Sequence, residues 1–210
     1  MLARASLAAL VAALLAAPAP AATLISEVFY DAVGSDNGLS FIEIAGAPGT
    51  VLDGLVLEGV NGGDGTIAPS LSLAGVIGGS GLFVVADESS AGATLVSGAN
   101  LVRNFDLQNG PDSLVLRSAA GVLDAVGYGA FSAGDVFAGE GSPAPDPAPG
   151  SSIARLFADV DTNDNAADFL ALATPTPGTA SFAPVPEPAG AALVAAGLVG
   201  LVRAGRSRMR

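Results

Sequence analysis

Hydrophobic residues are arranged in two different ways along this 210-residue chain. Residues 5–17 and 189–202 are two continuous apolar stretches near the ends. Between them, β-branched and aliphatic residues come in short runs broken by clusters of Gly, Asp, Asn and Pro, which is typical of strands joined by turns. Seven runs predict strands, at residues 23–30, 39–45, 55–60, 81–86, 113–117, 122–128 and 153–157. No window of a dozen residues in this middle part has a helical period, so we expect an all-β, antiparallel sandwich or barrel.

Two of these runs predict different degrees of burial. In residues 39–45, Phe41 and Glu43 alternate with Ile42 and Ile44, which predicts a strand with one face in water. Residues 81–86 are almost wholly apolar, so we expect that strand to be covered on both faces.

The middle of the chain is strongly acidic. Residues 22–183 contain three Arg, no Lys and 19 acidic residues, a net charge of −16. Such a domain repels phosphate backbones, so we expect no nucleic-acid partner. The chain has no His, Cys or Lys. These absences remove Ser–His, Cys–His and Ser–Lys nucleophiles and any zinc site built on His or Cys.

The N-terminal 21 residues have the three parts of a secretory signal peptide. Arg4 precedes the apolar stretch, and Ala19 and Ala21 flank Pro20 in a small-residue cleavage triplet. We expect signal peptidase to cut after Ala21, which leaves Ala22 as the first residue of the mature chain. An uncleaved membrane anchor is the alternative, but the apolar stretch is short for a stable span.

The C-terminal segment, residues 184–210, also predicts a membrane-directed element. As a helix, residues 189–202 would extend about 21 Å, less than the hydrocarbon core of about 30 Å. Arginines follow the apolar stretch and would stay on the cytoplasmic side. They are Arg203, Arg206, Arg208 and Arg210. The short span suits temporary retention, and a permanent tail anchor or an amphipathic surface helix is the alternative. The domain would thus be flanked by two apolar targeting helices.

Val185, Pro186, Glu187 and Pro188, followed by the apolar span and the Arg tail, resemble the PEP-CTERM sorting signal of Gram-negative bacteria. The resemblance implies recognition by an exosortase-type membrane protease, removal of the span, and delivery to the cell surface or extracellular matrix. Residues 174–184 would act as a spacer between the domain and this signal.

The middle of the chain resembles the lamin tail domains of secreted bacterial proteins. The matching segments, in order, are LISEV (24–28), FIEI (41–44), DGL (53–55), LQNGPDSLVL (107–116), VLDAVGYG (122–129), GSSIAR (150–155), DTNDNAADF (161–169) and TPTPG (174–178). The resemblance implies an immunoglobulin-like antiparallel β-sandwich over residues 22–183. Leu55 stands where many members have Trp, so this core lacks a large anchor. What the family implies for function is a binding or structural module, here with extracellular polysaccharide or surface proteins of a biofilm matrix as partners.

One segment has the spacing of a Ca²⁺ loop. Asp159, Asp161, Asn163 and Asn165 place oxygen ligands at alternate positions. Asp164 stands at the sixth position, where an EF-hand has Gly, and Leu170 at the twelfth, where it has Glu. The segment is therefore not an EF-hand, and an Asx-rich turn is the alternative to a Ca²⁺ site.

Two carboxylates, Glu27 and Glu43, lie inside apolar strands. A secreted glycosidase-like hydrolase could use such a pair, since glycoside hydrolysis needs two carboxylates. The alternative is that both side chains accept backbone hydrogen bonds or face water. No aromatic residues of a sugar-binding groove accompany the pair, so we expect a non-enzymatic domain.

The sorting-signal prediction is testable with a tagged Glu187→Ala variant. If an exosortase-type protease reads this motif, the variant should persist as the unprocessed, membrane-associated form in fractionated cells probed for the tag. Normal maturation of the variant would count against the prediction.

Overall fold

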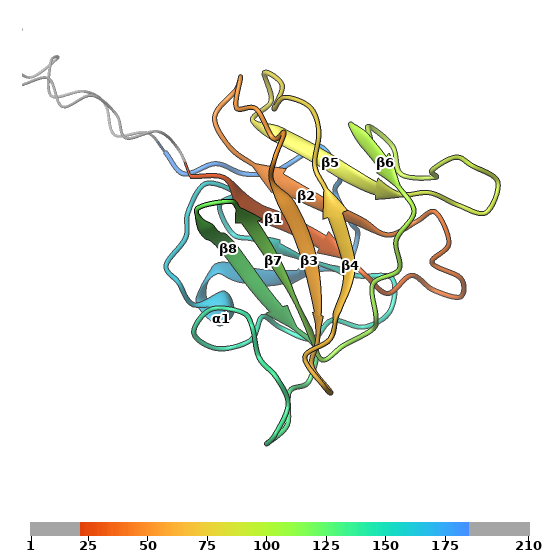
Figure 1. The fold of residues 1–210 in the computed structure, drawn as a ribbon, viewed down its shortest axis with the longest axis vertical. Helices are drawn as coiled ribbons and strands as arrows, with labels where there is room; N and C mark the ends of the chain where they lie inside the picture. The colour runs from red at the N-terminus through yellow and green to blue at the C-terminus, as the bar shows by residue number, and fades with distance from the viewer. Residues whose placement is uncertain (1–21, 185–210) are drawn as a thin grey trace, which may run out of the picture.

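The computed structural model describes residues 22–184, which form two β-sheets lying over each other (Figure 1). One sheet has six strands in the order β10-β9-β1-β2-β5-β6. Its strands are β1 (Leu24–Phe29), β2 (Phe41–Ala45), β5 (Leu82–Asp87), β6 (Leu101–Arg103), β9 (Ser152–Arg155) and β10 (Phe169–Leu172). All neighbours in it are antiparallel except β5 and β6, which are parallel.

The second sheet has four antiparallel strands in the order β4-β3-β7-β8. They are β3 (Val56–Asn61), β4 (Ile67–Ser72), β7 (Asp112–Ser118) and β8 (Gly121–Tyr128). The one helix in the described range is the single turn α1 (Asn165–Asp168). The prediction of an all-β, two-sheet domain is therefore confirmed.

The core is the apolar layer between the sheets. It includes fully buried side chains from both sheets, among them Ile25, Ile42 and Val85 from one and Leu57 and Leu114 from the other. Interdigitation of branched side chains from two facing sheets is the usual source of stability in a sandwich.

Two stacked tyrosines are the largest fully buried side chains of this core. Tyr30 follows β1, Tyr128 ends β8, and their ring centroids are 4.2 Å apart. Each hydroxyl donates a hydrogen bond, Tyr30 to Asp146 and Tyr128 to the carbonyl of Gln108. Leu55, at the expected Trp position, packs only partly buried against the core. The tyrosine pair thus supplies a large aromatic contact between the sheets.

All seven predicted strands are present, with their ends shifted by a few residues. The three strands that the pattern did not predict, β4, β6 and β10, each lie at the edge of a sheet. Residues 81–86 were predicted to be covered on both faces, and every residue of β5 is buried.

The predicted wet face of residues 39–45 is wrong. Every residue of β2 is buried, and Phe41 and Glu43 are 1% and 0% exposed. Phe41 belongs to a second apolar cluster with Phe29 and Val84, against which Val96 packs from the β5–β6 connection. Chain connections therefore cover the face of the six-stranded sheet that points away from the core.

The segment after β10, residues 173–184, is also part of the domain; we call it the C-terminal strap. The N–H groups of Thr176 and Gly178 donate hydrogen bonds to carboxylates of the six-stranded sheet. The Ser181 carbonyl and the Ala183 N–H bond to Ala158 and Asp159 in the loop after β9. The prediction that residues 174–184 form a spacer is therefore wrong.

The two predicted targeting helices fall on residues 1–21 and 185–210, outside the described range. Within residues 22–184, no helix has the length and apolar character needed to cross a membrane.

Candidate functional site

A buried arginine organises one end of the sandwich, where β8 and β9 come together. Arg155, on β9, has a side chain with no exposed surface. Its Nη2 lies 2.7 Å from Asp124 Oδ1 on β8, and its Nη1 lies 2.8 Å from Asp168 Oδ2 at the end of α1. The guanidinium lies over the ring of Phe169, 4.7 Å from its centroid. These contacts tie the edge of the four-stranded sheet to the six-stranded sheet.

The arginine also satisfies backbone groups. Its Nε donates to the carbonyl of Ile25 on β1 at 2.9 Å, and its Nη1 donates to the carbonyl of Val160 at 3.0 Å. Asp124 Oδ2 accepts a hydrogen bond from the Ile25 N–H. The ion pair between Arg155 and Asp124 therefore clamps the backbone of β1 from two sides.

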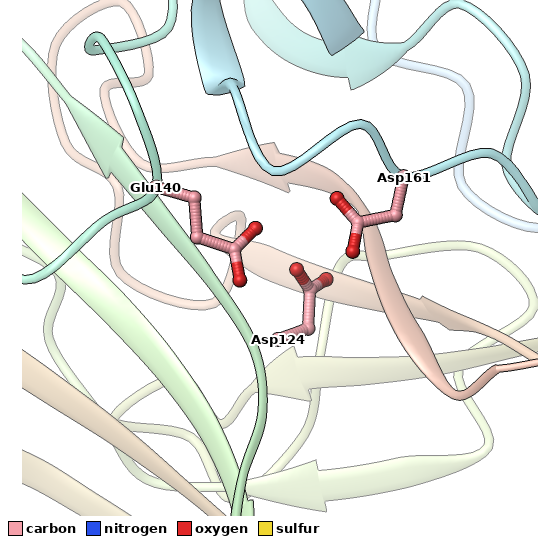
Figure 2. A group of neighbouring side chains, drawn as sticks. All are labelled: Asp124, Glu140 and Asp161. Atoms are coloured by element: carbon pink, nitrogen blue, oxygen red, sulfur yellow. The ribbon is translucent and has the colours of Figure 1, made fainter.

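Two further carboxylates approach this ion pair. Asp161 Oδ1 lies 3.5 Å from Arg155 Nη1. Glu140, on the connection between β8 and β9, points toward Asp124 and Asp161 (Figure 2). One carboxylate oxygen from each of these three residues lies within 4.8 Å of the other two. We call Asp124, Glu140 and Asp161 the acidic triad.

Glu140 is the member of the triad whose hydrogen bonding is incomplete. Its Oε2 is buried and has no hydrogen-bond partner within residues 22–184. A buried acceptor left without a partner costs about 1–3 kcal/mol. Burial, and then the charges of Asp124 and Asp161, raise the pKa of Glu140 to about 7, while Arg155 opposes the increase.

The pKa values of two neighbouring carboxyl groups, Asp124 and Asp168, shift in opposite directions. Burial raises the pKa of Asp124 despite the charge of Arg155. Burial also acts to raise the pKa of Asp168, but hydrogen bonds from the Thr162 N–H and hydroxyl, together with Arg155, hold it below its usual value.

Four carboxyl groups thus surround a single guanidinium: Asp124, Glu140, Asp161 and Asp168. Negative charge in excess of one cation draws in a proton or a further cation. Carboxylate oxygens are the ligands that hard divalent ions such as Ca²⁺ take in proteins. The acidic triad could therefore hold a metal ion.

Of the four residues predicted as Ca²⁺ ligands, Asp161 alone belongs to this triad. Asp159 Oδ1 accepts a hydrogen bond from the Ala183 N–H at 2.7 Å. Asn163 is exposed, and its φ of 59° lies in the left-handed region. Its N–H donates a hydrogen bond to Asp161 Oδ1, as in an Asx turn. Asn165 is fully buried, and its side chain bonds to backbone groups of Ala125, Gly127 and Glu140. The segment contains the Asx turn that was the alternative.

Sequence reasoning did not identify Asp124, Glu140, Arg155 or Asp168 as a group. A signal existed for two of them, because Asp124 and Arg155 are opposite charges inside two of the predicted strands. Nothing local distinguishes Glu140, which lies in a Gly-rich connection.

The carboxylates of Glu27 and Glu43 meet at a second place, under the C-terminal strap. The two residues are direct partners in the β1–β2 ladder, and both are buried. Glu27 accepts hydrogen bonds from the Ser152 hydroxyl at 2.6 Å and from the N–H and hydroxyl of Thr176 at 2.8 Å. Glu43 accepts from the Ser26 hydroxyl at 2.8 Å and the Gly178 N–H at 2.7 Å.

The pair lies on the wall of a cavity of about 350 Å³ between the sheet and the strap. Burial raises the pKa of Glu43 to about 7, opposed by the hydrogen bonds from Ser26 and Gly178, with a smaller increase from Glu27. Both side chains accept backbone and hydroxyl hydrogen bonds, as the non-catalytic alternative for this pair requires.

The remaining predicted site residues lie outside the described range. They are the cleavage residues Ala19 and Ala21, the motif Val185, Pro186, Glu187 and Pro188, and the tail residues Arg203, Arg206, Arg208 and Arg210. Comparison of the chain with models of protein families, with curated proteins and with solved structures finds no match.

The raised pKa of Glu43 makes stability depend on pH. A carboxyl group that titrates near 4.5 when unfolded and near 7 when folded binds its proton more tightly in the folded state. Its contribution to stability is therefore fully present below pH 4.5 and is lost as the pH rises to 7. A Glu43→Gln variant lacks this titration. The free energy of unfolding of the variant minus that of the parent should therefore be about 3 kcal/mol larger at pH 8 than at pH 4.

Urea unfolding of both proteins at pH 4 and pH 8 measures this difference, with the pH 4 pair as the internal control. Equal free-energy differences at the two pH values would contradict the assignment.

Proposed function

We propose that this chain is an exported, non-enzymatic binding or structural module of the cell surface or extracellular matrix. Its immunoglobulin-like, lamin-tail-like sandwich would be sorted by an exosortase-type protease after signal peptidase has acted, through a membrane-bound intermediate. The two-sheet architecture and the strongly acidic domain support this proposal. The same acidity argues against a nucleic-acid partner and favours extracellular polysaccharide or surface proteins that recruit or share cations.

The observation that carries the chemical part of the proposal is the unpartnered Oε2 of Glu140, which faces Asp124 and Asp161. A Ca²⁺ ion there would bind the Glu140 oxygen that has no hydrogen-bond partner, and it would offset the excess negative charge around Arg155. Ca²⁺ accepts six to eight oxygen ligands in flexible geometry, so waters would fill the positions that three carboxylates leave. Extracellular modules typically bind it weakly, with a Kd of about 10⁻⁴ to 10⁻³ M.

The position of the triad suggests what Ca²⁺ would do. Asp124 belongs to β8. Glu140 lies on the connection from β8 to β9, and Asp161 lies on the connection from β9 to α1. An ion shared by these groups would hold two connections against the sheet edge that Arg155 already clamps. We therefore propose a stabilising role for Ca²⁺ rather than a catalytic one.

A secreted, carboxylate-dependent hydrolase remains the second candidate. It is favoured by the cavity beside Glu27 and Glu43 and by the raised pKa of Glu43, because a general acid must hold its proton near neutral pH. Against it, both carboxylates are hydrogen-bonded to Thr176 and Gly178 of the strap. Substrate could reach them only after the strap had moved.

The Ca²⁺ proposal predicts a rise in melting temperature. A ligand that binds only the folded state at 100 times its Kd adds about 2.7 kcal/mol, equivalent to about 5–10 °C for a domain of this size. Glu140→Gln removes a triad ligand at nearly constant shape and should abolish the rise. Asp159→Asn is the matched control, because Asp159 belongs to the predicted loop but not to the triad, and should retain it. No rise in the parent protein, or a rise lost only in Asp159→Asn, would refute the triad as the site.

The two candidate functions are separated by a glycan-hydrolysis screen of the parent protein, Glu43→Gln and Glu140→Gln. The module proposal predicts no product from any of the three. Hydrolysis by the parent and Glu140→Gln but not by Glu43→Gln would replace it with the hydrolase.

A further inference from the structure

A shallow apolar groove lies where the described chain begins and ends. It has a volume of about 370 Å³ and is lined by Gly46–Pro48, Gly79–Gly81, Asp159, Phe182 and Ala183. Its one ionisable lining residue is Asp159, whose carboxylate accepts a hydrogen bond from the Ala183 N–H. Phe182 remains 39% exposed although it lines the groove. The groove is thus an apolar surface open to an external partner.

The two ends of the domain lie beside two neighbouring glycines of this groove, Ala22 beside Gly46 and Phe182 beside Gly81. The Gly46 N–H bonds to the Gly81 carbonyl at 2.9 Å. The carbonyl of Ala22 lies 3.8 Å from the place that a Cβ on Gly46 would occupy, and the ring of Phe182 lies 3.1 Å from the corresponding place on Gly81. Figure 1 shows the described chain entering and leaving the domain at the same corner.

The chain beyond Pro184 is too short to hold this corner away from a membrane. The apolar stretch begins at Ala189, five residues later. Five extended residues reach at most about 17 Å. The headgroup layer on one side of a bilayer is about 5–8 Å thick, so with residues 189–202 inserted the corner lies within about 10 Å of the lipid surface.

We infer that the groove is a lipid-docking surface, which seats the domain on the headgroup region of a bilayer while the C-terminal stretch is inserted. The inference rests on the proposed function, because it requires residues 189–202 to enter the membrane. Phe182 is the anchor, since exposed Phe side chains are among those that surface-bound segments bury at the headgroup boundary. The net negative charge of the domain makes a zwitterionic surface, such as phosphatidylcholine, the matching partner rather than an anionic one.

The chain contains no Trp, so a single introduced Trp reports on one position. Phe182→Trp and Pro48→Trp place the reporter on two walls of the groove. Leu95→Trp is the control, because Leu95 is 68% exposed on the β5–β6 connection, which lies on the far side of the domain from this corner (Figure 1). The full chain is reconstituted with phosphatidylcholine vesicles, with and without brominated acyl chains, and its folding is checked by thermal melting.

The inference predicts that the proteins float with the vesicles. Emission from Phe182→Trp and Pro48→Trp should shift to shorter wavelength and be quenched by brominated lipid, while that from Leu95→Trp should not. Flotation with equal or no quenching at all three positions overturns the docking surface and leaves the proposed span intact.

Failure of the chain to float overturns the proposed span, and the docking surface with it. A shift of Phe182→Trp emission that needs only a higher protein concentration, without vesicles, would assign the groove to a second copy of the chain and overturn lipid docking.

Discussion

The ion pair between Arg155 and Asp124 is the interaction on which the arrangement at this end of the sandwich depends. Burying two charges is expensive, so the gain from such a pair lies less in net stability than in fixing one geometry. Here the pair also takes up the N–H and carbonyl of Ile25 and therefore sets β1 against β8 and β9. The same pair draws Asp161, Asp168 and Glu140 around one cation. Burial and the charges of Asp124 and Asp161 together raise the pKa of Glu140, and the excess of carboxylates over one guanidinium is what would let the triad hold a metal ion.

A second constraint is the polar face of the six-stranded sheet. Glu27 and Glu43 lie side by side there, and neither could be buried without partners. The strap supplies partners for both through Thr176 and Gly178, so these residues are part of the folded domain rather than a free linker. A change in the charge of Glu43 therefore acts on the strap, whose Gly178 N–H donates to that carboxylate.

The interior strands were predicted because each is a short run of mostly β-branched and aliphatic residues bounded by turn residues. The three strands that the sequence pattern missed are all at sheet edges, where one side of the ladder needs no partner and the pattern weakens. β4 contains Pro69 and two serines, and β6 has only three residues. The prediction that one face of β2 is in water was wrong for a related reason. A Glu between apolar residues fits either a face in water or a face covered by another part of the chain. Only the tertiary structure shows that Thr176 and Gly178 cover it.

The candidate metal site was harder to predict than the fold because its three residues come from three separate segments. The Ca²⁺ hypothesis rested on spacing within one loop, and of its four residues only Asp161 belongs to the acidic triad. It assigned Asn165 to a ligand role, whereas the fold uses that amide to bind the backbone of β8 and of Glu140. Asp124 and Glu140 reach the same point only because β8 and the connection after it pass over the end of β9. A site assembled by sheet packing leaves little periodic signal in the sequence, but an Asp and an Arg inside two largely apolar predicted strands each need a partner if they are buried, which favours placing them together.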